Sequence, residues 1–230
     1  MAAGFAPWGP DHLGALAATV AVAAWFVLRQ RRAPSPLLLR GLAVLILLAQ
    51  AVDPLIAGSV GRLNVRQSLP LELCDLASFA AALALWTRRQ GPFEFAWFWG
   101  LSGTLMALLT PTVNRGFPHP EYFRFFVLHA GIVVAVLGLG AGLSMRPRRG
   151  AVWRVYGWTA VYACAVGLVD WALSANYFYL REKPPGSVLE PFGAWPWYIG
   201  AGALIGAALF FLLDLPFAGR GRGATDPAPS

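Results

Sequence analysis

The chain has 230 residues, of which 57% are hydrophobic and only 13% are charged, and its net charge is +7. Soluble domains are about one quarter charged, so this composition excludes an ordinary soluble protein. The basic residues stand in short clusters between apolar runs, which is typical of membrane topology and not of nucleic-acid binding. The sequence therefore predicts an all-α, polytopic membrane protein without a nucleic-acid partner.

Seven apolar stretches are long enough, or nearly long enough, to cross a hydrocarbon layer roughly 30 Å thick as helices. They predict a single seven-helix membrane domain, residues 1–217, followed by a disordered cytoplasmic tail, residues 218–230. The expected transmembrane helices are 11–28, 37–57, 69–87, 93–110, 122–144, 152–176 and 195–217.

The basic residues are divided unequally between the two ends of these helices. Twelve of the 18 lysines and arginines flank the first, third and fifth connections or follow the last helix. Cytoplasmic segments carry the excess of Lys and Arg in membrane proteins. We therefore expect the N-terminus outside, the C-terminus in the cytoplasm, and a multi-pass protein of the cell membrane.

Two rows of glycine lie inside the apolar stretches. Small residues let membrane helices approach each other closely, so we expect tight packing at both rows. No strand precedes either row, which argues against a nucleotide-binding loop. The rows are Gly138, Gly140 and Gly142 in the fifth helix, and Gly200, Gly202 and Gly206 in the seventh.

Polar side chains gather near the predicted outer ends of five helices. At about 1.5 Å per helical residue, Cys74 and Asp53 lie roughly 6 Å deep. The same estimate places Asp170 roughly 9 Å deep and His129 roughly 10 Å deep, while His12 sits at the outer mouth. Burying such groups in hydrocarbon costs several kcal/mol each unless they have partners. This layer is therefore the candidate functional site.

A thiol becomes a nucleophile when a neighbouring imidazole takes its proton, and a carboxylate can orient that imidazole. Cys74 and His129 are at matching depth and have the required chemistry. Asp170, Asp75 and Glu72 are the candidate carboxylates.

Each of these residues also has a purely structural interpretation. Cys74 is compatible with packing in a core, and His129 with a hydrogen bond between helices. The outer carboxylates are equally compatible with ion pairs that hold the helices together. Those pairs would join Asp53 and Asp170 to Arg66 or Arg181.

The cysteine and histidine spacing does not predict a metal site or a cofactor, because no CxxC or Cys/His pattern is present. Cys164 lies roughly 18 Å deep, too far from Cys74 for a disulfide, and we expect it to be a packing residue. His12 and His119 are expected to be solvated or interfacial.

The stretch 69–74, with the sequence LPLELC, resembles the LPLxLC opening of the YwaF-type bacterial integral-membrane proteins. The resemblance continues in order through nearly the whole chain. The further matching stretches are HL at 12–13, FWGLSG at 98–103, ALLTP at 107–111, FP at 117–118, FRFFVLHAG at 123–131, NYFYLREKP at 176–184 and WPWY at 195–198. The chain departs from the family at Glu72, where His is common, and at Ala130, which interrupts the usual HG pair.

An animal relative of this family is a phospholipid acyltransferase that uses a membrane cysteine and a histidine, which match Cys74 and His129. The resemblance implies a lipid acyltransferase or lipid hydrolase with a thioester on cysteine, acting on a phospholipid or lysophospholipid. We take Asp170 as the third catalytic candidate. The expected substrate-binding residues are Asp53, Glu72, Asp75, Thr110, Asn176, Arg181 and Trp197.

Two other functions are compatible with the same polar layer. One is a binding or transport protein for a small molecule or ion, with Asp53, Asp170 and His129 as its ligands. The other is a structural membrane protein in which the polar groups only fix the helix register. The sequence does not indicate an oligomeric state.

Overall fold

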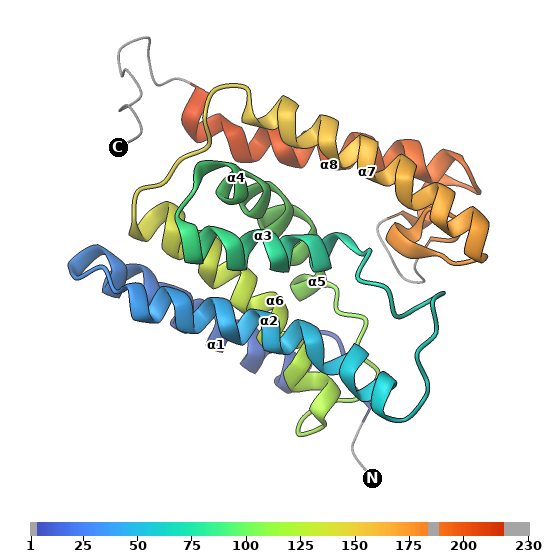
Figure 1. Cartoon of the computed structure of the whole chain (residues 1–230), viewed down its shortest axis with the longest axis horizontal. Coiled ribbons are helices and arrows are strands. Elements are labelled where there is room, and N and C mark those ends of the chain that lie inside the picture. Colours follow the sequence, from blue (N-terminus) through green and yellow to red (C-terminus); the bar gives the residue numbers. More distant parts are fainter. Residues whose placement is uncertain (1–3, 184–188, 219–230) are drawn as a thin grey trace.

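A computed structural model describes residues 4–183 and 189–218, and within them the regular structure is helical (Figure 1). The predicted all-α class is therefore confirmed for this part of the chain. Seven helical runs lie in sequence, two of them continued by π-helical turns. They are α1 (Pro10–Arg32), α2 (Pro36–Ser59), α3 (Leu73–Thr87), α4 (Gln90–Trp99) with η1 (Gly100–Thr104) and α5 (Leu105–Leu109), α6 (Pro120–Leu137) with η2 (Gly138–Gly142), α7 (Ala151–Leu173), and α8 (Trp197–Ala218), with short 3-10 turns η3 (Tyr177–Tyr179) and η4 (Glu190–Phe192) between the last two.

Each expected transmembrane helix matches one helical run, with both ends within four residues. Five runs are long and apolar enough to cross a membrane: α1, α2, α6 with η2, α7 and α8. The multi-pass membrane class is thereby supported. Crossing by the 15-residue α3 and by the run from α4 to α5 stays a prediction. The predicted disordered tail lies outside the described residues, except for Ala218 at the end of α8.

The helix α3 begins at Leu73, four residues later than expected. Glu72 is its N-cap, with extended backbone angles, and Asp75 Oδ2 accepts the backbone N–H of Glu72 at 2.9 Å. Acidic side chains are favoured at helix N-termini because they satisfy free N–H groups and interact with the helix dipole. The apolar residues before Glu72 therefore belong to the preceding loop, and Pro70 among them is itself unfavourable inside a helix.

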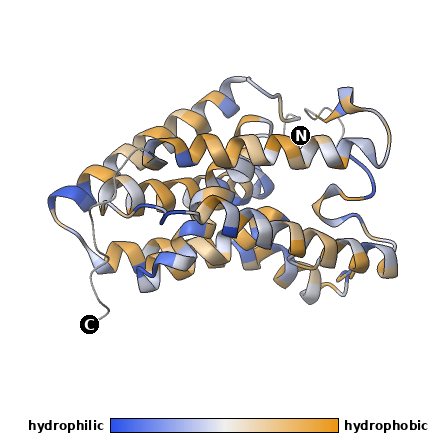
Figure 2. Cartoon of the chain, turned by 90° about the horizontal axis from the view of Figure 1, so that it is seen from above, coloured by the Kyte–Doolittle hydropathy of each residue, from blue (hydrophilic) through white to orange (hydrophobic). Residues whose placement is uncertain are grey.

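The helix α6 lies at the centre of the bundle. Of the residues in its most apolar part 72% are buried, compared with 11% to 17% for the other four helices that are long enough to cross a membrane. In Figure 1, α1 and α2 lie on one side of the bundle, and α7 and α8 run side by side along the other. Hydrophobic residues also cover the outside of the helices (Figure 2). Such a surface is suited to contact with lipid.

The first glycine row packs tightly, as expected. A methyl group placed on Gly138 would lie 2.5 Å from the ring of Phe26, and one on Gly140 would lie 2.7 Å from Trp97. The expectation is wrong for two members of the second row. A methyl group on Gly200 or Gly206 would meet no described neighbour within 4 Å, so these two glycines are not packing contacts in this chain.

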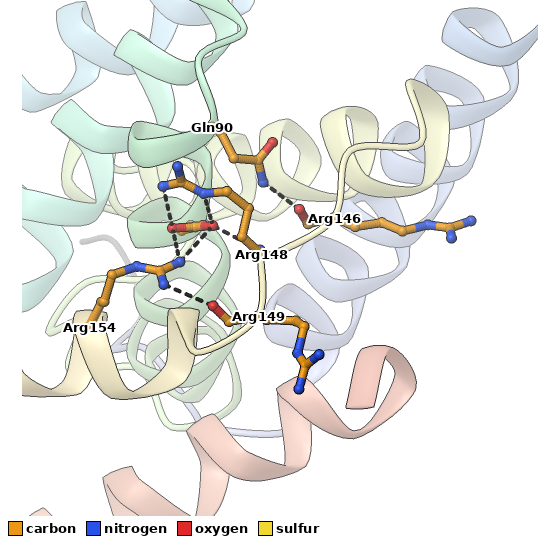
Figure 3. A network of polar contacts seen from close by, with 6 residues as sticks. Gln90, Arg146, Arg148, Arg149 and Arg154 are labelled. Atoms are coloured by element: carbon orange, nitrogen blue, oxygen red, sulfur yellow. Dashed lines mark hydrogen bonds and ion pairs between the residues drawn. The ribbon is translucent and has the colours of Figure 1, made fainter. Parts of the chain in front are cut away.

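A charged cluster ties α4 to the start of α7 and to the loop before it (Figure 3). The side chain of Glu94 is only 3% exposed and accepts hydrogen bonds from Arg148 at 2.8 Å and from Arg154 at 3.2 Å. The side chains of Arg146 and Arg149 point away from this carboxylate (Figure 3). Glu94 is thus an ion-pair partner between helices, beyond the helix-start position that its place in the sequence suggests.

Candidate functional site

Two polar contacts from α2 hold the starts of α3 and α6 at the same level. Gln50 Nε2 donates to Asp75 Oδ1 at 2.6 Å, and Asp53 forms an ion pair with Arg124 at 2.8 Å. Gln50 and Asp53 are three residues apart and therefore share one face of α2. Cys74 precedes Asp75 on α3, and His129 follows Arg124 on α6. The two candidate catalytic residues consequently lie on neighbouring helices at a similar depth.

The π-helical turn η1 contacts both of these helices. A methyl group on Gly103 would lie 2.8 Å from Leu73 Cδ2, next to Cys74. One on Gly100 would lie 3.1 Å from Ile132 of α6. His129 is three residues before Ile132, so both side chains belong to the stripe of α6 that faces η1. The helices that carry Cys74 and His129 therefore both contact this turn, although no hydrogen bond joins the two residues in the described part of the chain.

The imidazole of His129 is buried and is oriented by its own helix. Its Nδ1 lies 2.8 Å from the carbonyl oxygen of Phe125, and its ring stacks on Phe125 at 4.1 Å between centroids. A carbonyl oxygen only accepts hydrogen bonds, so Nδ1 carries the proton and donates it. The neutral ring then has an unprotonated Nε2, which is the form that a general base requires.

A hydroxyl group that the sequence analysis did not single out lies in the same turn. Thr104 is the last residue of η1, its side chain is fully buried, and its Oγ1 has no hydrogen-bond partner among the described residues. It lies one turn beyond Gly100, toward the level of His129. Turns with π-helical bonding are frequent at functional sites. The only signal in the sequence was its place beside the small residues of the GLSGT stretch.

The carboxylates around Cys74 support the loop that follows α7. Glu72 Oε2 accepts the backbone N–H of Phe178 at 3.0 Å, and Asp170 Oδ1 accepts that of Tyr177 at 2.8 Å. Asp170 is fully buried, and its second oxygen is unpaired among the described residues. The hydrogen bond from His129 Nδ1 is accepted by the Phe125 carbonyl. Asp170 therefore does not accept the hydrogen bond by which a carboxylate would orient this imidazole.

The loop after α7 is held in an unusual conformation. Phe178 and Tyr179 have φ angles of 57° and 53°, which are rare for residues other than glycine. Tyr198 donates its hydroxyl hydrogen to the Tyr179 carbonyl at 3.0 Å, and the indole of Trp195 donates to the Leu180 carbonyl at 3.1 Å. Partial burial raises the pKa of Tyr179, and nearby negative charge on Glu72 or Cys74 raises it further. The loop therefore reaches from α8 to the start of α3.

With this geometry established, comparison with known proteins places the chain. The profile of the TMEM164 family matches residues 7–214, which include all the candidate residues. The chain belongs to the TMEM164 family. The chain is also similar to an uncharacterized protein of Treponema pallidum (strain Nichols). The two are 28% identical over 197 residues, which cover 82% of this chain and 81% of that protein. No solved structure matches.

The remaining predicted binding residues of this TMEM164 family member mainly serve local structure. Asn176 Oδ1 accepts the backbone N–H groups of Arg181 and Glu182, each at 2.9 Å. Thr110 donates to the Met106 carbonyl at 2.9 Å. The side chain of Trp197 is 76% exposed, at the first turn of α8.

Two expectations about polar residues are corrected. Asp53 pairs with Arg124, and not with Arg66 or Arg181, because α2 runs beside α6. His12 is fully buried, since Phe5 and Phe126 pack around its ring. Its Nδ1 accepts the Trp8 N–H at 2.9 Å, so Nε2 donates to the Leu108 carbonyl at 2.8 Å.

Cys164 is exposed on α7, which corrects its expected role as a packing residue. Both cysteines are free thiols, in agreement with the prediction that they do not form a disulfide. No group of three or more His, Cys, Asp and Glu side chains in the described residues is arranged to hold a metal ion.

Proposed function

We propose that this TMEM164 family protein is an integral-membrane lipid acyltransferase or lipid hydrolase. Cys74 serves as the nucleophile and His129 as its base. One observation carries the proposal: the Phe125 carbonyl fixes the tautomer in which His129 Nε2 is free to accept a proton. The resemblance to an acyltransferase that uses cysteine and histidine supports the same pair, as does the shared contact of their two helices with η1.

The first half-reaction transfers an acyl group from a phospholipid to the thiol. His129 Nε2 takes the proton of Cys74 while the sulfur attacks the carbonyl carbon of the ester. The bond between that carbon and the glycerol oxygen breaks, and the leaving oxygen takes the proton from the imidazolium. The products are a lysophospholipid and an acyl thioester on Cys74.

The second half-reaction returns the thiol to its starting state. The hydroxyl of a lysophospholipid, or water, gives its proton to His129 and attacks the thioester carbonyl. The carbon–sulfur bond breaks and the sulfur recovers the proton. Thr104 supplies a hydroxyl that can donate to the oxyanion in both halves, because this hydroxyl is buried and unpaired.

The proposal includes an arrangement in the cell membrane with all seven helical runs crossing, the N-terminus outside and the C-terminus in the cytoplasm. Two features support this arrangement. Seven is an odd number of crossings, which puts the two termini on opposite sides of the membrane. Twelve of the 18 basic residues lie in the connections and the tail at the proposed cytoplasmic side. The reaction then takes place near the outer leaflet.

The test is acyl transfer by the purified protein in liposomes that contain a phospholipid with a labelled acyl chain and an unlabelled lysophospholipid. We expect Cys74→Ala and His129→Ala each to lower product formation at least 100-fold, while Cys164→Ala, at an exposed thiol, retains the activity. Because the two residues act as a unit, the double variant should be no less active than either single variant. Full activity of Cys74→Ala contradicts the proposal.

The product distinguishes the two reactions. Labelled phospholipid formed from the added lysophospholipid identifies a transferase, whereas labelled free fatty acid identifies a hydrolase.

A further inference from the structure

A pocket of about 410 Å³ lies between α7 and α8 at the end of the bundle that carries the η3 loop. Its walls come from three separate segments, and all but one of its lining residues are apolar. They are Gly167, Trp171, Leu180, Arg181, Trp195 and Ile199. The volume falls within the usual range for small-ligand sites, about 300–1,000 Å³.

The single charge in this lining is the guanidinium group of Arg181. The backbone N–H of Arg181 donates to Asn176 Oδ1 at 2.9 Å, and its Nη1 donates to the Ala175 carbonyl at 3.4 Å. The first contact holds the backbone at Arg181, and the second holds one end of its guanidinium group. A planar guanidinium binds phosphate oxygens by two parallel hydrogen bonds. The mouth of the pocket therefore has the chemistry for a phosphate group.

The apolar part of the pocket suits a hydrocarbon chain. Gly167 has no side chain, and a methyl group placed there would lie 3.7 Å from Leu180 Cδ1, so the glycine leaves room along α7. Trp171 and Trp195 are 82% and 63% exposed and flank the mouth. Tryptophan is enriched at this depth, where its ring contacts both headgroups and acyl chains.

The same loop forms a wall of this pocket and a wall of the candidate active site. Leu180 and Arg181 line the pocket, whereas Phe178 donates its N–H to Glu72, two residues before Cys74. The segment from Phe178 to Arg181 therefore connects the start of α3 with the lining of the pocket.

We infer that the pocket between α7 and α8 binds a glycerophospholipid, with its phosphate on Arg181 and one acyl chain along Gly167. The inference rests on the proposed function for the identity of this lipid as a substrate. It adds the site at which the lipid leaves the bilayer and approaches Cys74.

The test is photolabelling of the protein with a phospholipid that carries a diazirine in one acyl chain, followed by mapping of the labelled peptides. All variants contain Cys74→Ala, so that binding is measured without chemistry. We expect labels on peptides spanning residues 167–171 and 195–199. Arg181→Gln should reduce this labelling at least tenfold, and Arg66→Gln, at an exposed arginine outside the pocket, should not.

A second pair of variants tests the acyl-chain position. Gly167→Leu fills the pocket and should reduce the labelling, whereas Gly157→Leu, on the same helix with no described neighbour within 4 Å, should leave it unchanged. A photoreactive diacylglycerol, which lacks the phosphate, should label weakly.

Three results overturn the inference: labelling that is insensitive to Arg181→Gln, equal labelling by the diacylglycerol, or full competition by soluble glycerol phosphate. Specific labelling in the Cys74→Ala background, together with no acyl transfer by the protein that retains Cys74, would instead support the lipid site and contradict the proposed function. The two claims therefore fail separately.

Discussion

His129 is held by a carbonyl of its own helix. Because the Phe125 oxygen accepts from Nδ1 at 2.8 Å, the imidazole needs no carboxylate to keep the tautomer of a base. The nearby acids do other work, since Glu72 and Asp170 each accept a backbone N–H of the loop after α7. In this arrangement the carboxylates hold the loop and the backbone orients the imidazole.

Thr104 provides a prediction at this scale. The change Thr104→Val keeps the volume and removes a hydroxyl that is buried without a partner, a state that costs about 1–3 kcal/mol. We expect the melting temperature to stay the same or rise. Acyl transfer should fall about 100-fold, as is typical when one oxyanion donor is lost.

The control is Thr87→Val, at an exposed threonine whose hydroxyl donates to the Leu83 carbonyl at the far end of α3. It should not change the transfer rate. If Thr104→Val lowers the melting temperature and leaves the rate per folded molecule unchanged, the hydroxyl has a structural role only.

Part of this site was predictable from the residues themselves. The thiol and the imidazole could be singled out at Cys74 and His129, because charged and polar groups are rare enough in apolar helices to attract notice. The partner of His129 could not be predicted, since a backbone carbonyl leaves no mark in a sequence. Thr104 could not be singled out either, because its importance depends on a missing hydrogen bond.

Two carboxylates connect pairs of helices, but they differ in burial. The side chain of Glu94 is 3% exposed and joins α4 to α7, whereas that of Asp53 is 57% exposed and joins α2 to α6. Glu94 has two arginine partners and also accepts the backbone N–H of Arg148 at 2.8 Å. The buried contacts of Glu94 therefore hold α7 in place more strongly than the exposed ion pair of Asp53 holds α6.

This difference predicts unequal effects on stability. Glu94→Gln should lower the free energy of unfolding by about 1–3 kcal/mol, because it removes charge-assisted hydrogen bonds from a buried group. Asp53→Asn should lower it by less than about 1 kcal/mol, as is usual for exposed ion pairs. Thermal unfolding of both variants in the same detergent measures the two losses of stability. Equal melting temperatures for the two variants would contradict the predicted difference.

Helix boundaries followed from apolar length to within four residues, and the largest differences are at the end of α1 and the start of α3. At the start of α3 the carboxylate of Asp75 caps the backbone at Glu72, and the helix begins only at Leu73. The glycine rows show the same limit. Gly138 packs against Phe26 while Gly200 faces open space, and only helix rotation, which a sequence does not contain, distinguishes them.

The two ends of the helix bundle carry different groups of residues. Arginines and the Glu94 cluster gather at one end (Figure 3). The capped start of α3, the loop after α7 and the pocket between α7 and α8 gather at the other. The distribution of charge and the order of helices were predictable, whereas the pocket between α7 and α8 depends on long-range packing. A lipid-modifying site at one leaflet is consistent with this polarity.

The central claim is that Cys74 carries the acyl group, and the most direct test is to find it there. The protein is incubated with a phospholipid of one defined acyl chain, quenched in acid and digested, and the peptides are examined by mass spectrometry. We predict the mass of that acyl group on the peptide containing Cys74, its removal by neutral hydroxylamine, its loss in His129→Ala, and no acyl group on Cys164. Product formation without any acyl group on Cys74, or equal acylation of Cys164, would contradict the account.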